Sequence, residues 1–343
     1  MNMPGFVDLQ VNGYLGVDFS APELTAEAFS RAADALLAAG TAAFLPTVIT
    51  RPLDTYRRNL ERMAAAMEAP GYRGRLLGFH LEGPFISPEP GAVGAHNPAW
   101  VRAPDIDTLE RLQAWAKGKI RLLTVAAERP GAPELIAHAV KTGITVALGH
   151  QLAGADDLAR AADAGATALT HLGNGLPHLL NRHDNPIWDG LAEDRLTAML
   201  ITDGHHLPPR VLQSMIRAKQ PSRVVVTSDA SPIAGLPPGR YETLGNVAVL
   251  TETGRLYNPD TGYLVGSGSI MLQCMNTLAA QNRCDLPTLL RLGVDQPLAL
   301  LGLSATDLAP GERLAWDGER FSVVDRKQAH ASCSPPRSVH QGP

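Results

Sequence analysis

The sequence predicts an α/β fold, a (β/α)8 barrel of the TIM type that carries a reduced β-sandwich or hairpin as an appendage. Short apolar runs alternate with amphipathic helical patterns eight times along the chain. The runs are continuously apolar, as in parallel strands that are buried on both faces. A length of 343 residues suits one large barrel. The same alternation leaves a doubly wound open sheet as the alternative.

The barrel strands are predicted where short apolar runs occur. They are Gly5–Val11, Thr41–Thr47, Arg75–Glu82, Ile120–Val125, Ile144–Leu148, Ala168–His171, Leu196–Ile201 and Arg223–Ser228. Apolar positions at helical spacing predict the helices between and after them. These are Ala26–Ala39, Pro52–Met67, Ile106–Lys117, Pro133–Thr142, Ala155–Ala164, Pro208–Lys219 and Ile270–Gln281. The first of these helices has Thr25 as its N-cap and Gly40 beyond its end, which are typical boundary residues.

Two segments depart from the repeat. Residues 235–269 are rich in Gly, Pro, Tyr and Thr, which predicts a long loop or hairpin after the eighth strand. Leu314–Val324 places apolar residues on both sides of an Asp-Gly turn, which predicts a β-hairpin outside the barrel. We therefore expect a barrel over 4–310, a remnant β-sandwich hairpin over 311–325 and a disordered tail over 326–343.

Composition narrows the class of partner. The net charge of −4 gives no basic footprint for nucleic acid or an anionic membrane. The three cysteines form no CxxC pair, so we expect neither a disulfide framework nor a cysteine zinc site. Such cysteine usage favours a cytoplasmic protein. The N-terminus has no signal-peptide pattern, and no apolar run reaches the ~18 residues of a membrane span.

Polar side chains stand at the ends of several predicted strands, where a parallel barrel places its active site. Strand interiors favour Val, Ile and Leu, so each polar residue there needs a separate reason. The strand-end set is Asp8, Gln10, Asn12, His80, Glu82, His150, His171, Asp203, His205, His206 and Asp229.

Within this set, Glu82, His150 and His171 form a combination of one carboxylate and two imidazoles. Such ligands suit Zn²⁺ or Fe²⁺ with one position left open for water. The bound ion lowers the pKa of that water toward ~7 and polarises a carbonyl group. Asp229 stands where a general base could take the proton of the water and later pass it to a leaving amine. His80 points to the same side of its strand as Glu82 but one layer deeper, so it is expected to support the site rather than bind the ion.

These residues lie within motifs that resemble those of N-acetylglucosamine-6-phosphate deacetylases, members of the amidohydrolase superfamily. The matching motifs are Gly78–Phe85, Pro4–Asp8, Gly94–Asn97, Gly149-His150, Thr170–Leu172, Asp203–His206 and Thr227–Ala230, in order over roughly residues 4 to 310. The resemblance implies a metal-dependent barrel that removes acetate from the 2-amino group of a sugar phosphate. It implies that Glu82, His150 and His171 bind the metal and that Asp229 is the catalytic acid and base.

Two departures from the wider superfamily bear on this reading. Many amidohydrolases carry His-x-His at the end of the first strand for a second metal, whereas this chain has Gln10-Val11-Asn12, as some deacetylases of the family do. An amide is a weak ligand, so we expect one divalent ion per subunit, Zn²⁺ first, with Fe²⁺, Co²⁺ or Mn²⁺ as alternatives.

Family members usually also carry a segment before the first barrel strand that joins a β-sandwich. Here the first strand begins at Gly5, and Leu314–Val324 resembles the other half of that sandwich.

The resemblance also implies the residues that contact the substrate. Asn174, Gly175 and Arg182 match the phosphate-binding positions of the family, a chemistry that suits a guanidinium and backbone donors. The remaining positions are His96, which would polarise the acetyl carbonyl, His206, which would contact the substrate, and Gly266 and Ser267, which would line the acetyl pocket. The loop around Asn174 has Gly173, Gly175 and Leu176 where the family usually has an aromatic residue and Ala-Met, which leaves the substrate preference open.

The leading hypothesis is hydrolysis of N-acetyl-D-glucosamine 6-phosphate to D-glucosamine 6-phosphate and acetate, in amino-sugar catabolism. Two alternatives remain: deacetylation of another N-acyl amino sugar, and a non-catalytic sugar-phosphate-binding derivative. The resemblance further implies a homodimer.

Overall fold

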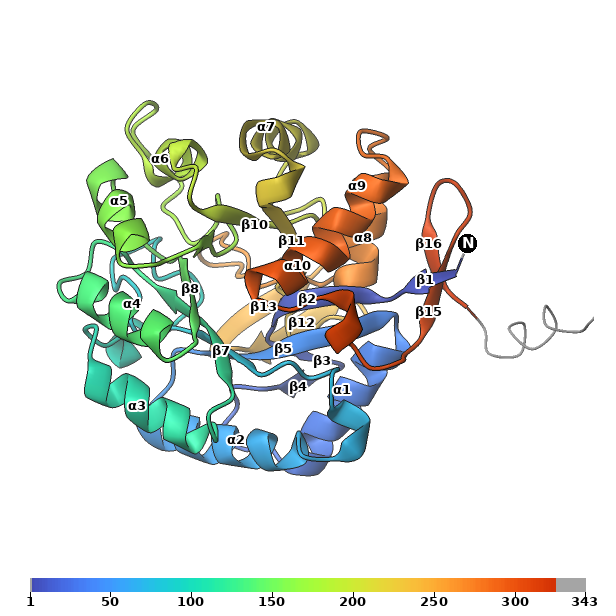
Figure 1. Ribbon diagram of the computed structural model, residues 1–343, viewed down its shortest axis with the longest axis horizontal. Coiled ribbons are helices and arrows are strands. Elements are labelled where there is room, and N and C mark those ends of the chain that lie inside the picture. Colours follow the sequence, from blue (N-terminus) through green and yellow to red (C-terminus); the bar gives the residue numbers. More distant parts are fainter. Residues whose placement is uncertain (1, 325–343) are drawn as a thin grey trace, which may run out of the picture.

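The structure is a computed structural model that describes residues 2–324, and it contains an eight-stranded parallel sheet curled into a barrel and surrounded by helices (Figure 1). The strands follow one another around the barrel in chain order. They are β2 (Phe6–Val11), β5 (Thr41–Ile49), β6 (Phe79–Glu82), β7 (Ile120–Val125), β8 (Thr145–Leu148), β9 (Ala168–Leu169), β10 (Thr197–Ile201) and β11 (Val224–Thr227). This sequential order confirms the predicted barrel, because a doubly wound sheet reverses its strand order part-way.

The seam between β2 and β11 is closed by side chains and a single bridge. Val11 pairs with Ala230 in a parallel bridge, and the backbone N–H of Asn12 donates to the carbonyl of Ala230 at 2.8 Å. The buried carboxylate of Asp8 accepts from Thr227 Oγ1 at 2.8 Å and from the backbone N–H of Ser228 at 3.1 Å. Asp8 therefore replaces ladder hydrogen bonds at the point where the sheet meets itself.

Helices cover the outside of the barrel (Figure 1). They are α1 (Ala26–Ala38), α2 (Leu53–Ala66), α3 (Ile106–Trp115), α4 (Ala132–Lys141), α5 (Ala155–Asp163), α6 (Pro186–Ala192), α7 (Pro209–Lys219), α8 (Met271–Ala279), α9 (Leu286–Leu290) and α10 (Gln296–Leu300), with a π-helical segment at Arg291–Asp295. Short 3-10 turns occur at Pro70–Tyr72, Pro98–Trp100, Pro221–Arg223 and Ala305–Asp307. The sequence reading missed α6, α9 and α10, each of which has a proline in its first turn, where no amide donor is needed.

The segment after β11 forms a second, smaller sheet. Its antiparallel strands are β12 (Gly239–Thr243), β13 (Asn246–Leu250) and β14 (Leu256–Tyr257). A separate short hairpin, β3 (Gly13–Tyr14) and β4 (Val17–Asp18), follows the first barrel strand. Leu250, Leu256 and Val265 form a separate buried cluster with Ile49 of the barrel. The segment predicted as a long loop or hairpin is thus a packed three-stranded sheet with a loop on each side.

The C-terminal hairpin is present, as β15 (Arg313–Trp316) and β16 (Phe321–Val323). A strand that the sequence reading missed, β1 (Asn2–Pro4), pairs antiparallel with β15, so the chain before the first barrel strand also contributes to this sheet. The ring of Phe321 packs edge-on against Phe6 at 4.9 Å, which docks the sheet on the barrel. The assignment of this small sheet as a reduced β-sandwich stays a prediction, and the tail predicted over 326–343 lies outside the described residues.

Over residues 2–324, no helix is both long and apolar enough to cross a membrane.

Candidate active site

A cavity of about 440 Å³ opens at the carboxyl ends of the barrel strands. Most of the residues singled out from the sequence contribute to its wall. Those that do are Asn12, Glu82, His96, His150, His171, Asn174, Gly175, His205, His206, Asp229 and Gly266. Parallel strands bring their carboxyl ends to one rim, so residues as far apart in the chain as Asn12 and Gly266 share this space.

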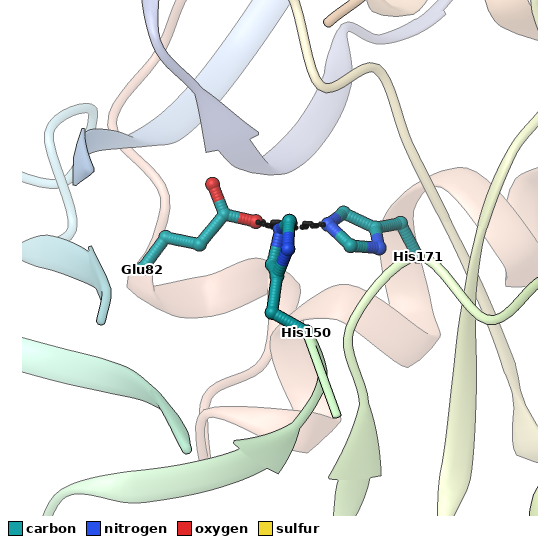
Figure 2. Close-up of side chains that lie close together, drawn as sticks. All are labelled: Glu82, His150 and His171. Atoms are coloured by element: carbon teal, nitrogen blue, oxygen red, sulfur yellow. Dashed lines mark hydrogen bonds and ion pairs between the residues drawn. The ribbon is translucent and has the colours of Figure 1, made fainter. Parts of the chain in front are cut away.

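Glu82, His150 and His171 converge at the bottom of this cavity (Figure 2). The Oε1 atom of Glu82 lies 3.2 Å from Nε2 of His150 and 2.9 Å from Nε2 of His171, and the two Nε2 atoms are 3.1 Å apart. All three side chains are buried. The three ligand atoms therefore surround one point, from the ends of three separate strands.

The backbone bends sharply at three of the site residues. His150, His171 and Asp229 have positive φ angles of 50°, 30° and 52°, a region that residues with a side chain rarely adopt. Each residue lies two positions beyond the end of a barrel strand, so this turn moves its side chain from the strand direction into the cavity. Strain of this kind persists only where the surrounding structure holds it, and it is concentrated at functional sites.

The donor set fits a divalent metal ion. Nδ1 of His150 lies 2.8 Å from the carbonyl of Ala92, so this nitrogen carries the proton and Nε2 presents a lone pair to the cluster. Ligands about 2.0–2.1 Å from a tetrahedral ion are ~3.3 Å apart, close to the separations seen here. Burial opposes charge on Glu82, yet hydrogen bonds to His150 and His171 hold the pKa of its carboxyl well below the usual range, so it remains an anionic ligand.

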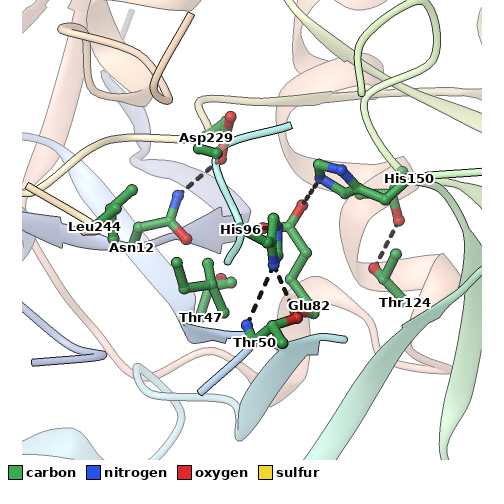
Figure 3. Close-up of polar contacts among 12 residues, drawn as sticks. Asn12, Thr47, Thr50, Glu82, His96, Thr124, His150, Asp229 and Leu244 are labelled. Atoms are coloured by element: carbon green, nitrogen blue, oxygen red, sulfur yellow. Dashed lines mark hydrogen bonds and ion pairs between the residues drawn. The ribbon is translucent and has the colours of Figure 1, made fainter. Parts of the chain in front are cut away.

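Two amide side chains surround this cluster. The Nε2 atom of Gln10 donates to Oε1 of Glu82 at 2.7 Å, and Nδ2 of Asn12 donates to Oδ1 of Asp229 at 2.7 Å (Figure 3). Both residues act here as donors to carboxylates.

Burial, and then the charge of Glu82, raise the pKa of Asp229 to about 6, which places it in the range of a general base near neutral pH.

His96 lies beside Glu82 (Figure 3). Its hydrogen bonds define which ring nitrogen carries the proton. Its Nδ1 accepts from the backbone N–H of Thr50 at 3.2 Å and lies 2.9 Å from Oγ1 of the same residue. Nδ1 is therefore an acceptor, and the ring proton is on Nε2, 3.7 Å from Oε2 of Glu82. Burial, followed by the charge on His150, lowers the pKa of His96 well below its ordinary value, so the ring is a neutral donor.

His206 lies on the cavity wall and is paired with the carboxylate of Asp203. Nδ1 of His206 lies 2.8 Å from Oδ2 of Asp203. Burial disfavours the imidazolium, but the charge and hydrogen bond of Asp203 outweigh burial and raise the pKa of His206. Ser267 donates to the same Oδ2 at 2.8 Å, so it supports Asp203, whereas Gly266 faces the cavity.

Arg182 and His80, like Ser267, lie away from the cavity wall. Arg182 is exposed, and its backbone carbonyl accepts from Nε1 of Trp188 at 2.9 Å. Its assignment to the phosphate stays a prediction. His80 is buried beneath the site, with Nε2 2.8 Å from Oγ1 of Thr124, and burial lowers its pKa to about 4.

The sequence reading did not identify several wall residues. His178 stacks on Tyr263 with ring centroids 4.3 Å apart, and Arg255 also lines the cavity. Tyr263 and Arg255 lie in the segment from β13 to α8, which has no strand-end pattern to mark it. A turn signal at Thr253-Gly254 was the one local indication there.

Comparison with known proteins assigns the chain to a family. A model described as the amidohydrolase family matches residues 1–298. The chain belongs to the amidohydrolase family. This amidohydrolase is 36% identical over 309 residues to an N-acetylglucosamine-6-phosphate deacetylase of Bos taurus, with 88% of this chain and 74% of that protein covered. It is 30% identical over 315 residues to an N-acetylgalactosamine-6-phosphate deacetylase of Escherichia coli O157:H7, with 90% and 81% covered. The resemblance seen in the sequence motifs is confirmed.

Solved structures agree with this assignment. An N-acetyl-D-glucosamine-6-phosphate deacetylase of Mycobacterium smegmatis superposes with a TM-score of 0.84 at 30% identity, over 94% of this amidohydrolase and 85% of that chain. An aspartate-to-alanine variant of that enzyme, solved in complex with N-acetyl-D-glucosamine 6-phosphate, gives a TM-score of 0.81 at 29% identity, over 95% and 83% of the two chains.

Proposed function

We propose that this amidohydrolase hydrolyses N-acetyl-D-glucosamine 6-phosphate to D-glucosamine 6-phosphate and acetate. The observation that carries the proposal is the convergence of Glu82, His150 and His171 beside Asp229 at the rim of the barrel. The curated relative from Bos taurus bears the name of this activity. The cavity of about 440 Å³ is within the range of small-molecule sites.

Glu82, His150 and His171 would together hold one divalent cation. Zn²⁺ suits two neutral imidazoles and a carboxylate best, and Fe²⁺, Co²⁺ or Mn²⁺ are the alternatives. When bound, such an ion supplies Lewis-acid polarisation and makes water nucleophilic near neutral pH.

Asp229 moves the proton. Its ionised carboxylate accepts a proton from water as the water oxygen bonds to the acetyl carbon. The same carboxyl then gives that proton to the sugar nitrogen as the C–N bond breaks, which leaves acetate and a free amine. His96 would donate from Nε2 to the acetyl oxygen, where negative charge develops in the transition state.

The phosphate would bind on the part of the cavity wall formed by the loops after β9 and β10. The side chain of Asn174 and the backbone N–H of Gly175 offer hydrogen bonds, and His206 adds positive charge because Asp203 favours its protonated form. Arg182 is proposed as a further phosphate ligand. Replacing Arg182 with alanine should raise KM for the phosphorylated sugar, and an unchanged KM would remove it from the phosphate site.

The relative from Escherichia coli O157:H7 favours a second candidate, N-acetyl-D-galactosamine 6-phosphate. The two sugars differ at one hydroxyl group, so both would place the acetamide and the phosphate in the same positions. A non-catalytic sugar-phosphate-binding derivative has less support, because Glu82, His150, His171 and Asp229 are all in place.

One assay distinguishes these possibilities. Acetate release is measured from both 6-phosphorylated sugars and from unphosphorylated N-acetylglucosamine, with and without a chelator. The proposal expects chelator-sensitive release that is fastest from N-acetyl-D-glucosamine 6-phosphate. Faster release from the galactosamine compound would transfer the assignment to the second candidate. No release from any of them, with a full complement of metal, would support the non-catalytic derivative.

We also propose that the chain acts as a cytoplasmic homodimer. The cytoplasm suits the free thiols of Cys274 and Cys284, and light scattering of the purified protein tests the dimer.

A further inference from the structure

The cavity wall contains more carboxyl groups than lysine or arginine side chains. Glu82 and Asp229 contribute two carboxyl groups to it. Among the described residues that line the cavity, Arg255 is the only arginine or lysine. A phosphate group carries nearly two negative charges at neutral pH and is repelled by the carboxyl groups, so it needs a cation elsewhere on the wall.

Two contacts hold the segment that carries Arg255 against the loop predicted to bind phosphate and against the loop that carries His206. Nε2 of His205, in the loop after β10, lies 2.9 Å from the carbonyl of Thr253 in the turn before Arg255. His178, in the loop after β9, stacks on Tyr263 just after β14. The small β12–β14 sheet is therefore attached to both loops, and Arg255 lies on the cavity wall between these attachments.

The backbone and side chain of Arg255 are positioned before any ligand binds. Its N–H donates to Oγ1 of Thr251 at 3.1 Å, and its carbonyl accepts from the N–H of Thr251 at 2.9 Å, which closes the turn. The guanidinium lies over the ring of Tyr257, 4.5 Å from the centroid. Stacking on an aromatic face restricts the side chain and leaves the guanidinium edge and its N–H donors unused.

Within residues 2–324, no carboxylate forms an ion pair with Arg255. A stacked guanidinium at the edge of a cavity can donate two parallel hydrogen bonds to two oxygens of a phosphate group.

We propose that Arg255 binds the 6-phosphate of the substrate and selects for phosphorylated over unphosphorylated amino sugars. The inference rests on the proposed function and adds a residue that supplies the phosphate charge from the same chain as the catalytic cluster. Tyr257 is the positioning residue that supports the guanidinium.

The test compares Arg255→Leu and Arg255→Lys with Arg240→Leu, a matched control at an exposed arginine on β12 of the same sheet. For Arg255→Leu, kcat/KM for N-acetyl-D-glucosamine 6-phosphate is expected to fall about 10- to 100-fold through KM, with kcat/KM for the unphosphorylated sugar unchanged. Arg255→Lys should recover part of the loss, and Arg240→Leu should behave as wild type. An equal loss on both sugars, or no loss on either, overturns the proposal.

A binding measurement keeps this result separate from the proposed function. If the wild-type holoenzyme releases no acetate from any phosphorylated sugar, the proposed function fails. Calorimetric titration with glucosamine 6-phosphate and with inorganic phosphate then decides the role of Arg255 alone. Weaker binding by Arg255→Leu than by Arg240→Leu supports that role. Equal binding, or no binding to the wild type, overturns it.

Discussion

Asn12 donates a 2.7 Å hydrogen bond from Nδ2 to Oδ1 of Asp229, across the seam where β2 meets β11 (Figure 3). The bond occupies one carboxylate oxygen and leaves the other for proton transfer. It also gives the amide at this position a role, since its nitrogen donates a hydrogen bond to the predicted base. The arrangement favours a single cation, held on the Glu82 side of the cavity.

Replacing Asp229 with asparagine should abolish turnover and keep the metal. The side chain retains its shape but can no longer accept a proton, so kcat should fall by about 10³-fold or more. Acetate release and metal content by atomic emission are measured together, with Asp260→Asn as the exposed control. Turnover near that of the wild type would remove Asp229 from the mechanism.

Removing His171 should remove the metal. His171→Ala leaves two of three ligands, so bound metal should drop well below one equivalent after dialysis, and activity should fall with it. His183→Ala, at an exposed loop histidine, is the control. Full metal occupancy in His171→Ala would show that the ion is held elsewhere.

The pH profile should show an acid limb set by Asp229. The base works only when ionised, and its pKa is raised to about 6, so kcat/KM should fall about tenfold per pH unit below that value. A cation next to Glu82 favours the ionised carboxylate and moves the limb to lower pH in the loaded enzyme. Rates are checked by returning samples to neutral pH, which excludes irreversible unfolding. An acid limb that lies above pH 7 would contradict the assignment.

Asp203 should affect substrate binding through His206. Asp203→Asn keeps the shape of the side chain but removes the charge that raises the pKa of His206, so the buried imidazole should become neutral at pH 7. KM for the phosphorylated sugar should rise about tenfold, and KM for the unphosphorylated sugar should change less. NMR titration of His206 measures the pKa directly. If the pKa of His206 does not fall in the variant, this account of the pair is wrong.

Asp8 should matter for stability because it closes the barrel. Asp8→Ala leaves the N–H of Ser228 and the hydroxyl groups of Thr227 and Ser228 without their buried acceptor, which should cost about 3 kcal/mol of unfolding free energy. Thermal denaturation of Asp8→Ala beside Asp260→Ala measures this cost. Equal melting temperatures in the two variants would mean that the seam is closed by backbone contacts.

Most of the barrel and of the catalytic cluster was predictable, because both follow from local patterns. Continuous apolar runs mark strands buried on both faces, and polar residues at their ends stand out against them. Glu82, His150 and His171 were found in this way, and the structure brings their ligand atoms within 4.8 Å of one another. The helices α6, α9 and α10 were missed because they are only five to seven residues long, which is too short to show a helical apolar period.

The sequence by itself determined the strand–helix repeat, the residue types at the rim and hence the class of chemistry, since each depends on the residues within one segment. Only the tertiary structure decided which groups from distant segments meet. It joined Asn12 to Asp229, set β1 beside β15 and put Arg255 on the cavity wall while leaving Arg182 outside it. These contacts depend on how loops and sheets pack across the barrel, and no pattern along the chain encodes that packing.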